Sequence, residues 1–259
     1  LSIVISLPPG ANGTLKSTRM KTVLPFRSRS RIDNLDISFY CRRQPFRQAC
    51  YSRQSYPMTY RRTTCFSILC CVLTAGSLLA AFPVSEWNQP MAPFRIIGNI
   101  YYVGASDVTS YRIKTPAGDI LRDGGLPETA PMIEKNIATL GFHLKDVKYL
   151  LNSHAHFDHA GGLAELKRAT GAKMLASRGD APLLERGGHH DFAFGDQYPF
   201  ASVKVDKVFD DGAVVSLGGA TLTAHVTPGH TKGCTTWTMP VVEAGKTYNV
   251  VFFCSTSAP

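Results

Sequence analysis

The chain has 259 residues, of which 44% are hydrophobic and 18% charged, and its formal net charge is +9 at pH 7. That charge does not indicate a nucleic-acid partner, because residues 1–57 carry ten basic and two acidic side chains while residues 63–259 carry 16 and 17. The nearly neutral remainder is long enough to bury a substantial core.

The N-terminal part divides at Met58. Residues 1–57 show no helical or strand periodicity, and we interpret them as a non-native upstream or disordered extension. Residues 58–62 are short and basic, and residues 65–81 form an apolar, uncharged stretch that ends in two alanines. This layout is typical of a secretory signal peptide, so residues 58–81 are predicted to direct the protein to the periplasm or medium. The stretch approaches the length of a membrane span, but its many small residues favour cleavage, and we expect no stable membrane anchor.

Residues 82–259 are predicted to form one α/β domain, because strand and helix patterns alternate along them. One helix follows Thr129, a predicted N-cap, and ends at Gly141, and a second covers residues 163–169 and ends at Gly171. Strands are predicted at residues 95–103, 110–114, 120–122, 147–151, 173–176, 203–209, 213–217, 220–226, 235–239 and 249–254.

A cluster of imidazoles follows the apolar strand 147–151 directly, in the sequence Ser-His-Ala-His-Phe-Asp-His. His154 and His156 are two residues apart, so at a strand end they project to the same side. Asp158 and His159 come on the turn that follows and can face a second point. Imidazole and carboxylate together suit a borderline divalent ion such as Zn²⁺. The spacing therefore predicts a site for two metals rather than a histidine-rich surface loop.

A later histidine can complete this site. His230 follows the turn dipeptide Pro228-Gly229, which ends the predicted strand 220–226. A lone histidine after a turn is usually solvated, but the upstream cluster favours His230 as the third ligand beside His154 and His156.

Other candidates have plainer interpretations. His143, His225 and the pair His189-His190 are predicted to be surface or structural residues. Asp123 either approaches the metals or only forms a turn with the two glycines after it. Cys234 and Cys254 are the two cysteines of the domain, and the sequence leaves open whether they are buried thiols or a disulfide.

The strings at residues 94–104, 153–162 and 222–239 resemble the metallo-β-lactamase superfamily, and within it the third subclass of secreted bacterial metallo-β-lactamases. The resemblance runs from about Trp87 to Pro259. It implies a four-layer αββα sandwich with two Zn²⁺ at one edge, held by His154, His156 and His230 and by Asp158 and His159.

The same resemblance implies an activity, which is zinc-dependent hydrolysis of the amide bond of a small-molecule β-lactam by a metal-bound hydroxide. Asp158 is then the catalytic residue that orients the nucleophile. Ser255 and Ser257 match serines that bind the substrate carboxylate in some members of the subclass, although they could also be plain polar residues at a strand end.

Two further expectations concern the C-terminal end. Family members carry a last metal ligand, a histidine, beyond the strand at 249–254, and no histidine follows His230 here. We therefore expect the domain to be incomplete at its C-terminus. Two alternatives to a β-lactamase remain, namely a hydrolase of the same superfamily acting on lactones or thioesters, and an inactive metal-binding fragment.

Overall fold

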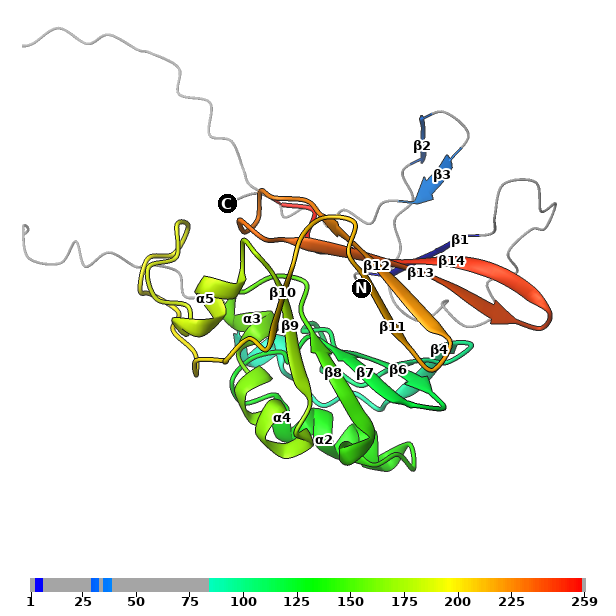
Figure 1. The fold of residues 1–259 in the computed structure, drawn as a ribbon, viewed down its shortest axis with the longest axis horizontal. Coiled ribbons are helices and arrows are strands. Elements are labelled where there is room, and N and C mark those ends of the chain that lie inside the picture. Colours follow the sequence, from blue (N-terminus) through cyan, green and yellow to red (C-terminus); the bar gives the residue numbers. More distant parts are fainter. Residues whose placement is uncertain (1–2, 7–28, 33–34, 39–83, 258–259) are drawn as a thin grey trace, which may run out of the picture. The chain divides into compact units, whose positions relative to one another are not determined.

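The computed structural model describes residues 3–6, 29–32, 35–38 and 84–257 (Figure 1). The chain divides into two units, one formed by Leu1–Asn12 and Ala81–Pro259 and the other by Gly13–Ala80. In the second unit, strands β2 (Arg29–Ile32) and β3 (Leu35–Ser38) pair as an antiparallel hairpin. The predicted signal peptide at residues 58–81 lies outside the described residues. None of the helices that the structure describes is long and apolar enough to cross a membrane.

A seven-stranded sheet forms the first half of the domain, in the order β10-β9-β8-β7-β6-β5-β4. Strands β4 to β7 are antiparallel neighbours, whereas β7, β8, β9 and β10 run parallel. The strands are β4 (Phe94–Ile97), β5 (Ile100–Tyr102), β6 (Tyr111–Thr115), β7 (Gly118–Arg122), β8 (Val147–Leu151), β9 (Lys173–Ser177) and β10 (Lys207–Phe209). Because parallel strands end at the same edge, the residues that follow β7, β8 and β9 come together there.

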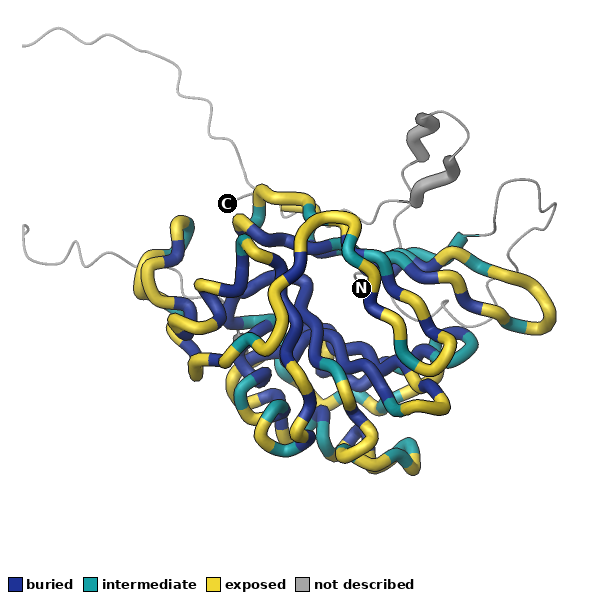
Figure 2. Tube along the Cα trace, viewed as in Figure 1, coloured by how far each residue is buried: buried dark blue, intermediate teal, exposed yellow. Residues whose placement is uncertain are grey.

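A five-stranded antiparallel sheet packs against it, in the order β1-β14-β13-β12-β11. Its strands are β1 (Ile3–Ser6), β11 (Val214–Leu217), β12 (Ala220–Val226), β13 (Thr235–Glu243) and β14 (Lys246–Phe252). Apolar side chains of both sheets fill the space between them, and the largest of these that are fully buried include Trp237, Tyr111 and Phe252. In Figure 2, dark blue tube marks buried residues in the strands of both sheets.

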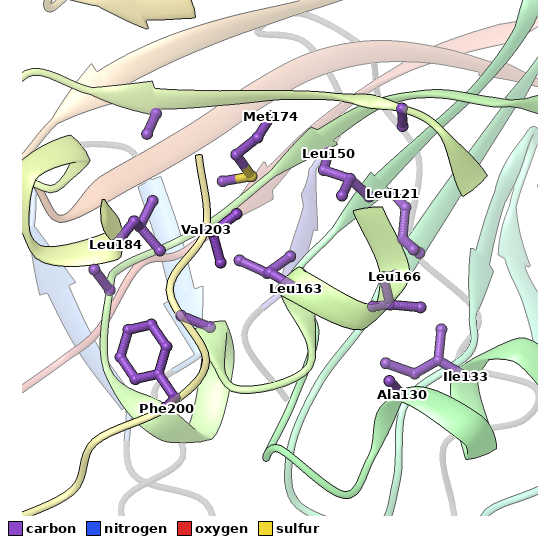
Figure 3. Close-up of a cluster of buried hydrophobic side chains, with 14 of the residues drawn as sticks. Leu121, Ala130, Ile133, Leu150, Leu163, Leu166, Met174, Leu184, Phe200 and Val203 are labelled. Atoms are coloured by element: carbon purple, nitrogen blue, oxygen red, sulfur yellow. The ribbon is translucent and has the colours of Figure 1, made fainter. Parts of the chain in front are cut away.

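Helices cover the outer face of the seven-stranded sheet (Figure 1). The connections carry α1 (Val84–Trp87), α2 (Ala130–Thr139), the 3-10 turn Leu144–Asp146, α3 (Phe157–Ala160), α4 (Leu163–Thr170) and α5 (Ala181–Glu185). A second core lies under them, where Ile133 and Leu166 meet Leu121 and Leu150 of the sheet (Figure 3). Consecutive residues of β7 thus serve different cores, since Ile120 faces the other sheet while Leu121 faces the helices.

Most predicted elements are found, and the differences have local causes. Residues 95–103 are not one strand but two, β4 and β5, because Gly98 turns the chain with a φ of +50°. Only Lys207–Phe209 of the predicted strand 203–209 pairs with β9, since the amide of Val203 donates instead to the carbonyl of Leu184.

One domain-level expectation differs from the structure, and the expected fold class is confirmed. Residues 1–57 were expected to hold no regular element, yet β1 pairs with β14 from Ile3↔Phe252 to Ser6↔Asn249, and β2 and β3 also lie in this segment. The α/β class and the two packed sheets agree with the expected sandwich. The described residues place no helix on the outer face of the five-stranded sheet, so they account for three of the four expected layers.

Candidate metal centre

The segment after β8 is fixed between the two sheets. The indole nitrogen Nε1 of Trp237 donates to the carbonyl of Asn152 at 3.0 Å, and the amide of Thr235 donates to the carbonyl of Ser153 at 2.7 Å. Both donors belong to β13 of the opposite sheet. His154 follows at once and is buried, so its position is set by two rigid elements rather than by a free loop.

Three imidazoles meet at this edge, as predicted. His156 Nδ1 lies 3.1 Å from His230 Nε2, and the ring of His154 lies 4.4 Å from that of His230 and 5.0 Å from that of His156. One nitrogen from each ring falls within 4.8 Å of the others, which is a spacing that could hold a metal ion. His154 Nε2 is buried and has no hydrogen-bond partner among the described residues. A buried lone pair without a partner, in a set of three imidazoles, fits a borderline cation such as Zn²⁺.

The electrostatics of the three rings also suit a cation. Burial lowers the pKa of His154 well below its usual range, and the neighbouring imidazoles lower it further. Burial lowers the pKa of His156 to about 4 and also lowers the pKa of His230. The three rings are therefore neutral at pH 7, and neutral imidazole is the form that binds a metal.

A second group shares His154 with Asp158 and His159. Asp158 Oδ1 lies 4.0 Å from His154 Nε2, and its Oδ2 lies 3.7 Å from His159 Nε2. The two groups are contiguous, as the spacing of the motif predicts. Asp158 and His159 lie on the short helix α3 rather than on a plain turn, and both are only partly buried. The side chains of Asp158 and His159 are 26% and 15% exposed, so solvent reaches this second group.

Asp123 supports both groups through hydrogen bonds. The sequence leaves open whether this residue approaches the site or only forms a turn, and the structure places it beside the site. It is fully buried, its φ is +64°, and its Oδ1 accepts hydrogen bonds from the amide and the hydroxyl of Ser153 at 2.6 and 3.0 Å. Its Oδ2 lies 3.2 Å from His159 Nδ1 and 2.9 Å from Arg122 Nη1. Burial alone would lower the pKa of His159, but Asp158 and Asp123 outweigh it and raise that pKa. Asp123 thus contacts Nδ1 of His159, and Nε2 of the same ring faces Asp158.

A second buried carboxylate, Asp180, joins the segment that carries His154 and His156 to the segment that carries His230. Its Oδ2 accepts from the amide of Ala155 at 2.9 Å and from the hydroxyl of Thr231 at 3.0 Å, and its Oδ1 accepts from the amide of Gly233 at 2.8 Å. The approach is so close that a Cβ on Gly233 would collide with the backbone of Asp180. Burial raises the pKa of Asp180 to about 6. Sequence analysis missed this residue, whose three partners are 25 to 53 positions away.

The two predicted substrate serines lie at the rim of the site. Ser257 Oγ is 3.4 Å from His230 Nδ1, and Ser255 Oγ is 3.2 Å from Ser257 Oγ. The chain reaches this position because β14 ends at Phe252, next to the start of β13. Both hydroxyls are partly or fully accessible, so they could donate to an anionic group of a ligand.

The two cysteines of the domain are joined by a disulfide, with a Cα–Cα distance of 5.7 Å. Both side chains are buried, and Cys254 Sγ lies 3.9 Å from His154 Nδ1. The bond therefore connects the segment after His230 with the residues that follow β14, close to His154.

The remaining histidines lie apart from the site, as predicted. His143 precedes the 3-10 turn and is exposed. His225 is exposed on β12, where its Nε2 bonds Thr238 Oγ1 at 2.8 Å. His189 and His190 are exposed and face Asp196.

Comparison with known proteins agrees with this architecture. The family model described as Metallo-beta-lactamase superfamily matches residues 103–242. The solved structure of native FEZ-1 metallo-beta-lactamase from Legionella gormanii is 47% identical, covers 66% of this chain and 66% of its own, and has a TM-score of 0.65. The class B3 di-zinc metallo-beta-lactamase LRA-12 from an Alaskan soil metagenome is 40% identical, covers 64% of this chain and 63% of its own, and has a TM-score of 0.62.

Curated relatives carry a different name. Hydroxyacylglutathione hydrolase from Hyphomonas neptunium is 34% identical over 106 residues, which is 41% of this chain and 34% of that protein. The chain spans about a third of the length of the curated relatives it matches.

Proposed function

This chain belongs to the metallo-beta-lactamase superfamily, and we propose that it hydrolyses the amide bond of β-lactams with the help of bound zinc. The relatives of this chain include both a metallo-beta-lactamase and hydroxyacylglutathione hydrolases. The substrate class is therefore the part of the proposal that needs the most support.

In this proposal, His154, His156 and His230 hold one Zn²⁺, and Asp158 and His159 contribute to a second. Bound zinc supplies a Lewis acid and lowers the pKa of a coordinated water toward neutrality. The chain contributes three neutral imidazoles whose free nitrogens converge, so no proton has to leave them before a cation binds.

Two further roles fall to side chains around the ligands. Asp158 is the partly exposed carboxylate of the cluster, so it can orient a water molecule and accept its proton. The hydroxyls of Ser255 and Ser257, next to His230, can donate hydrogen bonds to the carboxylate that β-lactam antibiotics carry. The substrate would then lie between the metal ligands and the end of β14.

The observation that carries the proposal is the two-group cluster of His154, His156, His230, Asp158 and His159 within a chain that is 47% identical to a metallo-β-lactamase over 66% of its length. The test is turnover by purified protein supplied with Zn²⁺, followed by ring-opening absorbance of a penicillin, a cephalosporin and a carbapenem. We expect hydrolysis of at least one of them that a chelator abolishes and added Zn²⁺ restores.

A second candidate function is the hydrolysis of thioesters, and the names of the curated relatives favour it. The same protein preparation should be assayed with a glutathione thioester and a lactone. Turnover of the thioester without ring opening of any β-lactam would replace our proposal with this one. Tight zinc binding without turnover of any substrate would favour an inactive metal-binding fragment.

We also propose that the protein is exported, with residues 58–81 as the signal peptide. The disulfide between Cys234 and Cys254 supports this, because such bonds persist in oxidising compartments. N-terminal sequencing of protein recovered from the periplasm of a bacterial host should place the first residue near 82. Recovery of a chain that still begins near residue 1, and that retains β1, would refute export by cleavage at this signal.

A further inference from the structure

Asp191 is a buried carboxylate in an otherwise exposed loop. In the sequence the loop lies between α5 and Phe200, and the residues adjacent to Asp191, His190 and Phe192, are exposed, Phe192 by 54%. The Asp191 side chain is nevertheless only 4% exposed. Burying a carboxylate costs free energy unless hydrogen bonds compensate it, so the position needs a physical reason.

The two oxygens of Asp191 have different surroundings. Its Oδ1 accepts hydrogen bonds from the amides of Ala193 and Phe194 at 2.7 and 2.9 Å, and these bonds close the turn. Its Oδ2 is buried without a hydrogen-bond partner among the described residues and lies 3.5 Å from His156 Nε2. That nitrogen is also buried without a partner. One carboxylate oxygen and one imidazole nitrogen therefore face each other in isolation.

The two nitrogens of His156 point to different partners. Nδ1 lies 3.1 Å from His230 Nε2, on the side where the three imidazoles converge, and Nε2 faces Asp191. A neutral imidazole carries its proton on one nitrogen only. A proton on Nε2 faces the Asp191 carboxylate, 3.5 Å away, and leaves the Nδ1 lone pair toward the other two rings. A proton on Nδ1 would instead place two lone pairs, on Nε2 and on Asp191, against each other.

We propose that Asp191 is a positioning residue that holds His156 as the Nε2–H tautomer and thereby presents the Nδ1 lone pair to the metal. The inference rests on the proposed zinc site and names a supporting group for one of its ligands. Because the same carboxylate closes the turn at Ala193 and Phe194, it also fixes the loop to the site. The ring of Phe194 lies 4.8 Å from that of His156, which adds a second contact between loop and ligand.

Substituting Asp191 by asparagine or by alanine should have different effects on the tautomer of His156. In Asp191→Asn, the amide oxygen takes the Oδ1 position, because two backbone N–H groups must be accepted there. The NH₂ group then faces His156 Nε2 and requires a lone pair on it, which moves the ring proton to Nδ1. Asp191→Ala removes the partner and imposes neither tautomer. The asparagine variant should therefore impair zinc binding more than the alanine variant does.

The experiment measures the tautomer and the zinc affinity separately. Long-range ¹H–¹⁵N spectra of metal-free protein identify the protonated nitrogen of His156, with His156→Gln used for assignment. Competition with a chromophoric chelator gives the dissociation constant for Zn²⁺ alone. The matched control is Asp196→Asn, since Asp196 is exposed in the same loop and bonds the amide of His190 at 2.8 Å without approaching His156.

We expect the wild-type ring to carry its proton on Nε2 and the asparagine variant to carry it on Nδ1. The zinc dissociation constant should rise about 10- to 100-fold in Asp191→Asn and at most about tenfold in Asp191→Ala, and stay within about threefold in Asp196→Asn. An unchanged tautomer and affinity in Asp191→Asn would overturn the proposal, as would weaker zinc binding by the alanine variant than by the asparagine variant. If the wild-type chain binds no zinc, the proposed function fails, whereas the tautomer measured without metal still decides the role of Asp191.

Discussion

Removing the disulfide between Cys234 and Cys254 should lower the free energy of unfolding by about 3 kcal/mol. The bond closes a loop whose ends are 20 residues apart. Closing a loop of this size reduces the entropy of the unfolded chain by roughly 11 cal/mol/K, which corresponds to about 3 kcal/mol at 25 °C. The folded state should survive the change, because β13 and β14 stay paired from Trp237↔Phe252 to Glu243↔Lys246 without the bond.

The assay is urea unfolding of the wild-type protein and of the double variant Cys234→Ala/Cys254→Ala, each with and without reductant. Both proteins keep the other five cysteines, so any effect of reductant on those appears in both. We expect reductant to lower the stability of the wild type only once unfolding has exposed the disulfide and allowed its reduction, since both sulfurs are buried in the native state. Reductant should leave the double variant unchanged. A difference below about 1 kcal/mol between oxidised wild type and double variant, at equal m-value, would refute the loop-closure reasoning.

Three further outcomes test the site. Asp158→Asn should reduce hydrolysis by at least roughly 10²-fold while the three-histidine group still binds zinc, whereas His225→Gln should stay within a few-fold in the same absorbance assay. Asp123→Ala should lower the free energy of unfolding in urea by about 3–5 kcal/mol, because it leaves the buried guanidinium of Arg122 without its carboxylate. In metal-free protein, His156 should contribute a loss of stability as the pH falls from about 6.5 to 4, since unfolding lets this imidazole, with its folded pKa of about 4, take up a proton. Asp180, with its folded pKa of about 6, contributes in the opposite sense over part of this range. The contribution of His156, about 1.4 kcal/mol per pH unit, is therefore measured as the difference between the slopes of the wild type and of His156→Gln.

The residues that we propose as metal ligands were predictable because most of them are close together in the sequence. His154, His156, Asp158 and His159 occupy six consecutive positions after a strand whose apolar run identifies it as buried. Their relative geometry follows from the end of one strand and the start of one short helix. His230 was predictable for a related reason, since a turn dipeptide after a strand of the facing sheet places it at the same edge.

The supporting carboxylates were not predictable because their partners are distant in sequence. Asp180 precedes Ala181-Pro182 at the start of α5, where local rules would assign its side chain to cap the helix. No capping bond forms there, and the carboxylate bonds residues of both ligand segments instead. Thr129 behaves similarly, because its hydroxyl accepts from Leu126 and donates to Asn88 rather than capping α2. In both cases, hydrogen bonds to groups outside the helix outweigh the local preference for capping.

Strand β1 shows a different limit of sequence reasoning. Four residues in an N-terminal segment without periodicity carry too little pattern to identify a strand, yet Ile3–Ser6 pairs with the edge of β14. Pairing of this kind depends on an exposed edge elsewhere in the chain, which no local pattern records. Export with cleavage near residue 82 would remove this strand, so the mature protein would need another way to protect that edge.

The three buried carboxylates around the histidines suggest why this site should couple metal binding to folding. Arg122 pairs with Asp123, but among the described residues no lysine or arginine pairs with Asp180 or Asp191, and the three imidazoles beside them are neutral. Burial raises the pKa of Asp180 to about 6, because the charged form of a carboxyl is less stable in the protein interior than in water. A divalent cation placed among the ring nitrogens would offset these charges and satisfy the buried nitrogen of His154 at the same time. Since an ion bound only by the folded chain stabilises it, zinc bound at the proposed site would also make the fold more stable.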